Sequence, residues 1–244
     1  MRALSDQDIL DVWDRGVAAR PAYRALLLLA SSCPGEAIEK LAGLYIGQRD
    51  SMLLDLRTMT FGSKLRCLAT CPKCKERFDL VFDSSEIRIA SKNKVGETQS
   101  LIAGGFEVFF RLPNSLDLLA IGECRDVSSA REILLQRCIL SARQDEKDIS
   151  PGLLHSAVTD CLEKKMESED PQADIQISLS CSSCSENWSQ AFDIVSFFWS
   201  EIDFWARRIL EEVSALAKAY GWSEAEILAL SPRRREIYLE MANR

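Results

Sequence analysis

The longest regular pattern of apolar positions lies near the carboxyl end of the chain. Apolar side chains recur every three or four positions there, at Phe198, Ile202, Trp205, Ile209, Val213, Leu216 and Tyr220. This spacing places them on one face of an α-helix, and the pattern predicts a helix of about seven turns that ends at Gly221. A capping box at 223–226 predicts a short helix ending at Leu230, and Ser231-Pro232 predicts a last helix over 233–243.

Helical patterns also fill the amino-terminal part of the chain. Ser5 and Asp8 predict the start of a helix, and Pro21 predicts a second start within the segment 5–31. A further helix is expected over 36–58. The residues 61–63, Phe-Gly-Ser, then interrupt the pattern.

Between these helical parts the apolar period changes to two. Phe78, Leu80 and Phe82 alternate with polar neighbours, which is typical of a strand, and further strands are expected at 87–89, 97–102, 106–111 and 175–179. Helices are expected at 116–121, from a capping box at 129–132 to Cys138, and at 150–166. The predicted fold class is α+β, with helical N- and C-terminal parts around a small antiparallel sheet.

Two stretches within the strand-rich part repeat one pattern. Each begins with two cysteines separated by two residues, continues with aromatic residues four and eight positions after the second cysteine, and ends with an aspartate. The first copy is Cys71, Cys74, Phe78, Phe82 and Asp83, and the second is Cys181, Cys184, Trp188, Phe192 and Asp193. The regularity predicts the same turn followed by the same strand, twice.

The paired cysteines Cys71, Cys74, Cys181 and Cys184 have the spacing of two halves of one split, zinc-ribbon-like site. Four thiolates would complete a tetrahedral shell around Zn²⁺ with no position left for water or substrate, so the predicted metal is structural. Iron can take the same four ligands, and the spacing leaves that alternative open. A redox-active Cys-x-x-Cys pair in a thiol oxidoreductase is a further alternative.

Five other cysteines are scattered singly at Cys33, Cys67, Cys124, Cys138 and Cys161. The odd total of nine argues against a framework of disulfides. Cys67 lies four positions before Cys71, but the duplicated pattern omits it. We therefore expect the metal shell to omit it too.

A shared metal would join two distant parts of the chain. We therefore expect one interlocked unit with three parts: an N-terminal helical segment over 1–66, a zinc-stapled α+β core with inserted helices over 67–195, and a C-terminal helical segment over 196–244. Removing the metal is expected to loosen the centre of this unit.

Composition and motifs narrow the function. The net charge of −7 and the isoelectric point near 5.0 disfavour a nucleic-acid partner. The longest apolar run, 25–30, is too short to cross a membrane, and the first residues lack the apolar stretch of a secretory signal, so we expect a cytoplasmic protein. The single histidine, His155, lies in an apolar helical setting, and no nucleophile elbow, phosphate loop or paired-histidine motif is present. We expect no enzymatic activity and no small-molecule substrate.

The carboxyl-terminal part carries the candidate partner-binding residues. Its aromatic residues exceed what one helix face buries, and its three consecutive arginines place positive charge at a helix start, where the helix dipole disfavours it. Packing in the core and a solvated helix start are the alternative interpretations. The candidates for contact with a partner are Trp199, Trp205, Tyr220, Trp222, Arg233 and Arg234.

Several of these stretches together resemble one known family. They are both cysteine pairs and the segments 46–50, 54–57, 61–62, 170–174, 192–201 and 217–239. They are similar to the baseplate hub assembly chaperone family of contractile-tailed phages and phage-tail-like contractile injection systems.

The resemblance implies a non-enzymatic assembly factor or baseplate component that binds hub or baseplate subunits, in a bacterial or infected cell. It leaves open whether the protein is retained in the assembled particle. A zinc-ribbon adaptor that binds nucleic acid or another protein complex is the alternative, which the acidic charge disfavours.

Overall fold

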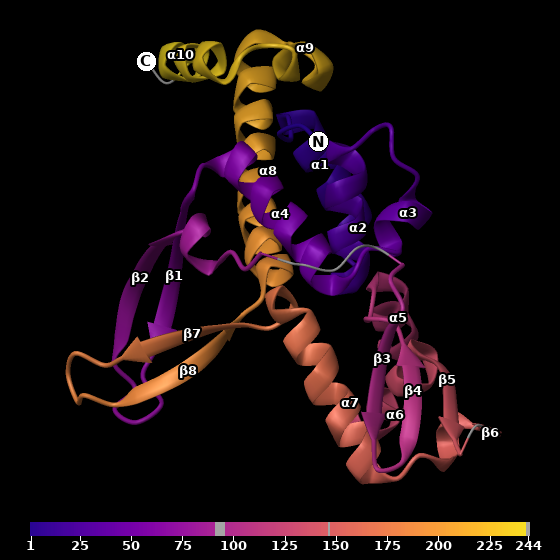
Figure 1. Cartoon of the computed structure of the whole chain (residues 1–244). Helices are drawn as coiled ribbons and strands as arrows, with labels where there is room; N and C mark the ends of the chain where they lie inside the picture. The colour runs from indigo at the N-terminus through magenta and orange to yellow at the C-terminus, as the bar shows by residue number, and fades with distance from the viewer. Residues whose placement is uncertain (91–95, 146, 243–244) are drawn as a thin grey trace.

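A single long helix, α8 (Ile194–Tyr220), forms the axis of the molecule in the computed structural model, which describes residues 1–90, 96–145 and 147–242 (Figure 1). Its predicted apolar stripe is largely buried, with Phe198, Ile202 and Leu216 fully covered. The helix ends at Gly221, whose φ of 72° is left-handed and therefore suits glycine. The sequence prediction for this element is confirmed.

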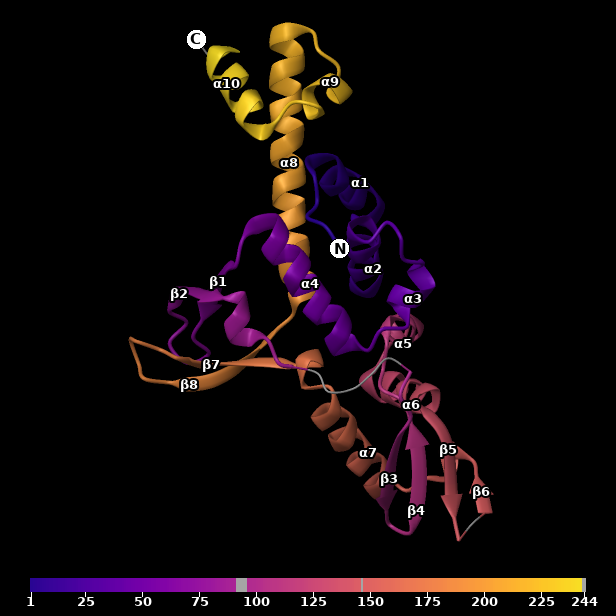
Figure 2. The same cartoon turned by 45° about the horizontal axis from the view of Figure 1, so that its top comes forward.

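Four amino-terminal helices lie beside α8: α1 (Asp6–Gly16), α2 (Pro21–Ser32), α3 (Ile38–Ala42) and α4 (Ile46–Phe61). Of these, α1, α2 and α4 contact α8 directly and share its main hydrophobic core (Figures 1 and 2). The helix starts at Ser5 and Pro21 are confirmed. The single helix predicted over 36–58 is wrong, because Tyr45 adopts an extended conformation and pairs with Asn114 in an isolated β-bridge.

Two short helices, α9 (Glu224–Leu228) and α10 (Pro232–Ala242), follow α8 and fold back against it (Figure 2). The predicted capping box is confirmed, because Ser223 and Glu226 bond to each other's backbone N–H groups. The last residue of the helix predicted over 233–243 lies outside the described part of the chain.

Two β-hairpins project from the helical body: β1 (Lys64–Thr70) with β2 (Arg77–Asp83), and β7 (Ile175–Ser180) with β8 (Asn187–Phe192). The structure confirms the strands predicted after the first cysteine pair and before the second. It also adds β1, which the sequence interpretation missed. The strand predicted at 87–89 is wrong, since Ser84–Ile87 forms a 3-10 turn, η1, that Asp83 caps.

A second lobe contains a separate antiparallel sheet with the strand order β3-β4-β5-β6. Its strands are β3 (Gln99–Ala103), β4 (Phe106–Phe110), β5 (Ile139–Gln144) and β6 (Lys147–Ile149). Its helices are α5 (Ser115–Ile121), α6 (Val127–Cys138) and α7 (Ser156–Glu169). The sheet of this lobe is thus distinct from the two hairpins, and the prediction of one small sheet is corrected.

Two helix starts in this lobe also differ from prediction. Asp126, rather than Ser129, caps α6 by accepting a hydrogen bond from the Ser129 backbone N–H group. Pro151 begins only a short 3-10 turn, η2 (Pro151–Leu153), and α7 starts five residues later. The lobe has its own hydrophobic core, built around Phe110, Val108 and Leu162.

A polar junction joins the two cores at the start of α4. The backbone N–H group of Ile46 donates to the Pro113 carbonyl at 3.2 Å, and that of Gly47 donates to Asp170 Oδ2 at 2.8 Å. Asp170 begins the short turn η3 (Pro171–Ala173), which leads into β7. The mixed fold class is confirmed, while the division at 66 and 195 stays a prediction. None of the described helices has the length and apolar content needed to span a membrane.

Candidate metal centre

The two cysteine pairs lie at the tips of the two hairpins, in turns of identical construction. In the first turn the Cys71 N–H group donates to the Glu76 carbonyl at 2.9 Å, and Lys75 has a left-handed φ of 63°. In the second turn the Cys181 N–H group donates to the Glu186 carbonyl at 2.9 Å, and Ser185 has a φ of 58°. The duplicated sequence therefore folds into a duplicated turn.

The four sulfur atoms converge on one point between the hairpin tips. Cys71 Sγ lies 3.6 Å from Cys184 Sγ, and Cys74 Sγ lies 3.6 Å from Cys181 Sγ. All four sulfur atoms lie within 4.8 Å of one another. A tetrahedral Zn²⁺ site with metal–sulfur bonds of about 2.3 Å has sulfur–sulfur edges of about 3.8 Å. The four cysteines can therefore hold a metal ion.

Backbone groups also favour thiolates at this position. The N–H groups of Lys73 and Cys74 bond to the sulfur of Cys71, and those of Glu76 and Glu186 bond to the sulfurs of Cys74 and Cys184. Hydrogen bonds of this kind stabilise negative charge on sulfur and orient the ligand. The donor set is thus suited to a soft, tetrahedral cation.

The two hairpins pack against each other as matching copies. The first cysteine of each pair lies against the second cysteine of the other pair, as a local two-fold arrangement requires. The aromatic residues at equivalent positions of the two copies also meet. The ring centroids of Phe78 and Trp188 lie 6.0 Å apart and those of Phe82 and Phe192 lie 5.8 Å apart, both pairs edge to face. The aromatic repeat of the sequence is therefore the contact between the hairpins.

The aspartate that closes each copy is a helix cap. Asp83 accepts a hydrogen bond from the Ser85 N–H group at 3.1 Å and begins η1. Asp193 accepts one from the Val195 N–H group at 2.9 Å and begins α8. The second hairpin thus leads directly into the central helix, whereas the first leads into η1.

Cys67 lies on β1 outside the four-sulfur cluster, as expected from the sequence pattern. Burial raises the pKa of its thiol, and the neighbouring Glu201 carboxylate adds to the effect. Cys33 and Cys138 are buried, whereas Cys161 is exposed. His155 is an exposed residue that precedes α7 and packs its ring against Phe106.

The predicted partner-binding residues fall into three environments. Trp199 is buried, with the Arg24 guanidinium 4.4 Å from its ring centre. Tyr220 and Trp222 stack at 4.6 Å and pack against Tyr238 of α10, so they hold the end of α8 to that helix. Contact with a partner stays a prediction for all six residues. Of the six, Arg233 and Arg234 are exposed, and Trp205 lies partly exposed in a groove.

The sequence interpretation missed the role of Arg235, the third arginine of the run. Only 3% of its surface is exposed, and its guanidinium bonds to Asp6 and Glu212 and to the Leu230 carbonyl. An apolar pattern cannot reveal this contact, because its acidic partners lie on other helices.

The geometry and a comparison with known families now define the class of protein. The family model for the T4 bacteriophage base plate protein matches residues 22–199, which is most of the chain and includes all four clustered cysteines. This protein is therefore a phage baseplate-related protein. In particular, the chain belongs to the T4 bacteriophage base plate protein family. No curated protein and no solved structure gives a significant match.

Proposed function

We propose that this protein is a non-enzymatic assembly factor or component of the baseplate of a contractile phage tail or tail-like injection system, and that it binds hub or baseplate subunits. Membership of the baseplate family is the observation that carries the proposal. The convergence of four thiols without an open ligand position supports a structural rather than a catalytic role for the metal.

The proposed metal is Zn²⁺, and its proposed effect is mechanical. One hairpin begins just after α4, and the other ends where α8 begins. A metal that joins the hairpin tips would fix the distance between these two helices at their hairpin ends. The ion pair between Arg57 of α4 and Glu201 of α8 supports the same junction, with bonds of 2.9 and 2.6 Å. The helical body is thereby presented as one rigid surface.

Co-expression with the baseplate proteins of the same particle tests the proposed function. The tagged chain is expected to retain at least one hub or baseplate subunit through purification, with zinc at one ion per chain by elemental analysis. Retention of none of them would overturn the assembly role. Iron in place of zinc would correct the metal and leave the assembly role intact.

The same preparation separates the other two interpretations. Salt-sensitive binding of DNA or RNA would favour a nucleic-acid adaptor. Reversible oxidation of Cys71 and Cys74 in a metal-free protein that stays folded would favour a thiol oxidoreductase. We expect neither result.

A further inference from the structure

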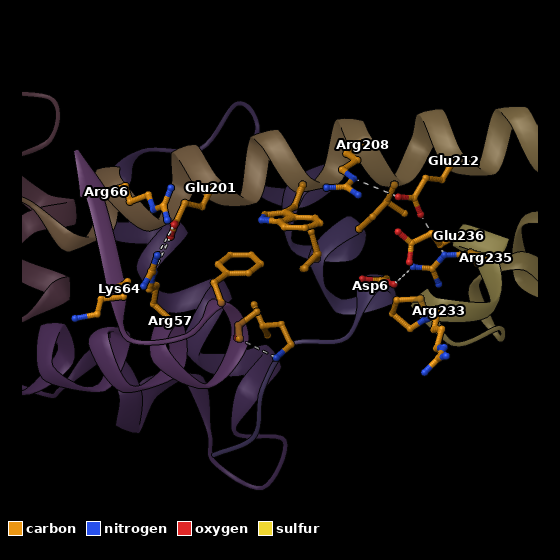
Figure 3. Close-up of a pocket in the computed structure, with 17 residues that line it drawn as sticks. Asp6, Arg57, Lys64, Arg66, Glu201, Arg208, Glu212, Arg233, Arg235 and Glu236 are labelled. Carbon is orange, nitrogen blue, oxygen red and sulfur yellow. Dashed lines mark hydrogen bonds and ion pairs between the residues drawn. The ribbon is translucent and has the colours of Figure 1, made fainter. Parts of the chain in front are cut away.

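An open groove of about 930 Å³ runs along α8 on the side of α10 (Figure 3). The end of α4 and the start of β1 border one end of it. The amino-terminal segment and the start of α10 border the other end. This volume is in the range of sites that bind a peptide segment or a small ligand.

The floor of the groove is apolar and aromatic. The rings of Phe61 and Trp205 stack at 5.7 Å with an angle of 14° between their planes, and Leu4, Ile9 and Ile209 extend the apolar surface. Neither aromatic ring is fully buried in the core. A partly exposed aromatic pair inside a concave site is typical of the centre of a protein interface.

The walls carry more positive than negative charge, the reverse of the chain as a whole. The lining has six basic residues, Arg57, Lys64, Arg66, Arg208, Arg233 and Arg235, and four acidic ones, Asp6, Glu201, Glu212 and Glu236. The whole chain has 30 basic and 37 acidic residues. The groove is thus a local positive site on an acidic protein.

Ion pairs within the protein occupy most of the acidic groups. Asp6 bonds to Arg235, Glu201 bonds to Arg57, and Glu212 bonds to both Arg208 and Arg235. Two cations remain without an ion-pair partner among the described residues: Arg66 on β1 and Arg233 at the start of α10. Lys64 lies beside Arg66. Its Nζ atom is 3.7 Å from Asp83 Oδ2, and its side chain is 67% exposed.

These available cations lie toward opposite ends of the apolar floor. In Figure 3, Lys64 and Arg66 are at the β1 end and Arg233 is at the α10 end. A ligand that satisfies both ends needs negative charge at two separated positions and an apolar group between them. An acidic protein segment with a central aromatic or aliphatic side chain has this arrangement.

We propose that the groove binds an acidic segment of a baseplate protein, with an apolar side chain on the Phe61–Trp205 stack and carboxylates at Arg66 and Arg233. The inference rests on the proposed assembly function and identifies its contact site. Nucleic acid fits less well, because a phosphate backbone carries many regularly spaced charges, whereas the groove offers few unpaired cations on a chain of net charge −7.

Charge reversals with matched controls test the groove. The variant R66E/R233E reverses the charge of the two groove cations that have no ion-pair partner among the described residues. The control R77E/R125E makes the same change at two exposed arginines outside the groove, one in the same hairpin and one in the second lobe. All four side chains are exposed, so both variants are expected to fold, which circular dichroism checks.

The probe is an array of short overlapping peptides that covers the baseplate proteins of the same particle. We expect the wild type to bind peptides with an apolar residue flanked by acids, less tightly as salt increases. R66E/R233E is expected to lose about tenfold or more in affinity, and R77E/R125E less than about twofold. The groove is ruled out if the array shows no binding, if the bound peptides are basic, or if both variants lose affinity equally.

Co-expression of the same variants separates the two proposals. If the wild type and R66E/R233E capture a baseplate subunit equally well, the assembly function stands and the groove inference is wrong. If the wild type captures no baseplate subunit but still binds acidic peptides through the groove, the assembly function is wrong. The preference of the groove for acidic peptides is then still supported. Binding of single-stranded DNA that R66E/R233E abolishes would instead assign the groove to nucleic acid and overturn the inference.

Discussion

The sulfur atoms of Cys71 and Cys184 lie 3.6 Å apart, although 113 positions separate the two residues in the chain. The second lobe, with its four-stranded sheet and three helices, is contained in the segment between them. A metal at this point therefore closes a loop around a whole lobe. Because closure entropy grows slowly with loop length, the large loop adds little to the cost of forming the site.

The first prediction concerns the metal ligands. C71S is expected to abolish metal binding and to lower the free energy of unfolding by several kcal/mol, since structural zinc contributes about 10 kcal/mol or more in small peptides. C67S is the control and is expected to change stability by less than about 1 kcal/mol. Elemental analysis and urea denaturation measure both effects. A C71S protein with its full metal content would contradict the assignment.

The second prediction concerns the local two-fold arrangement of the hairpins. Phe78 and Trp188 occupy equivalent positions in the two copies and meet edge to face. A double-mutant cycle of F78L and W188L is expected to give a coupling energy of about 0.5–1.5 kcal/mol. The control cycle pairs F78L with F109L in the second lobe, and its effects are expected to add. Equal coupling in the two cycles would argue against a direct contact between the hairpins.

The duplicated motif was the most predictable part of the protein, because every element of it is local. The two turns and the strands β2, β7 and β8 depend on residues that lie close together in the sequence. The pattern could not show that Phe78 meets Trp188, since pairing between the copies is a tertiary contact.

In the second lobe β3, β4 and α5 were predicted, but β5 and β6 were missed. In β5, Ile139 and Ala142 are both buried, which breaks the two-residue period of a strand. The cause is an irregularity between Phe109 and Phe110, where the register of β4 against β5 shifts. Strand β1 does alternate, with Leu65 and Ala69 buried, but the exposed Leu68 obscures the pattern.

The third prediction concerns Arg235, which joins the two ends of the chain through Asp6. R235A leaves the carboxylates of Asp6 and Glu212 without their buried partner. It is expected to weaken the packing of α10 against the rest of the protein by about 2 kcal/mol. This cost is smaller than for a fully buried ion pair, because both carboxylates are partly exposed. Hydrogen exchange of α10 is expected to accelerate more than that of α4. R234A is the control, and an equal effect of both variants would contradict the proposed anchor.

The fourth prediction concerns the junction between the two cores. A β-carbon on Gly47 would lie 2.0 Å from Asp170 Oδ1, so G47A must displace the carboxylate that accepts the Gly47 N–H bond. G47A is expected to lower the free energy of unfolding by about 1–3 kcal/mol, which is the cost of a buried donor without its acceptor. This cost outweighs the higher helix propensity of alanine. G35A is the control, because a β-carbon there meets nothing within 4 Å. Thermal denaturation compares the two variants.

The fifth prediction concerns the pH dependence that Asp170 gives to the same junction. Burial raises the pKa of its carboxyl above 3.8, while the Gly47 N–H group and the Arg49 guanidinium act in the opposite direction. The folded state therefore binds more protons than the unfolded state just above pH 4. The contribution of Asp170 to the free energy of unfolding is therefore greatest below that pH. It decreases as the pH rises through the pKa that Asp170 has in the folded protein.

The variant D170N removes this titration and keeps an oxygen that can accept the Gly47 N–H bond. Its stability relative to the wild type is therefore expected to increase as the pH rises from about 4 to 8. Because the measurement follows how the stability difference between D170N and the wild type changes with pH, any effect of the new amide group that is independent of pH cancels. D174N, at an exposed position of the same segment, is expected to show no such change. Urea denaturation across this range measures the slope, and a slope of the opposite sign would mean that ionised Asp170 stabilises the junction.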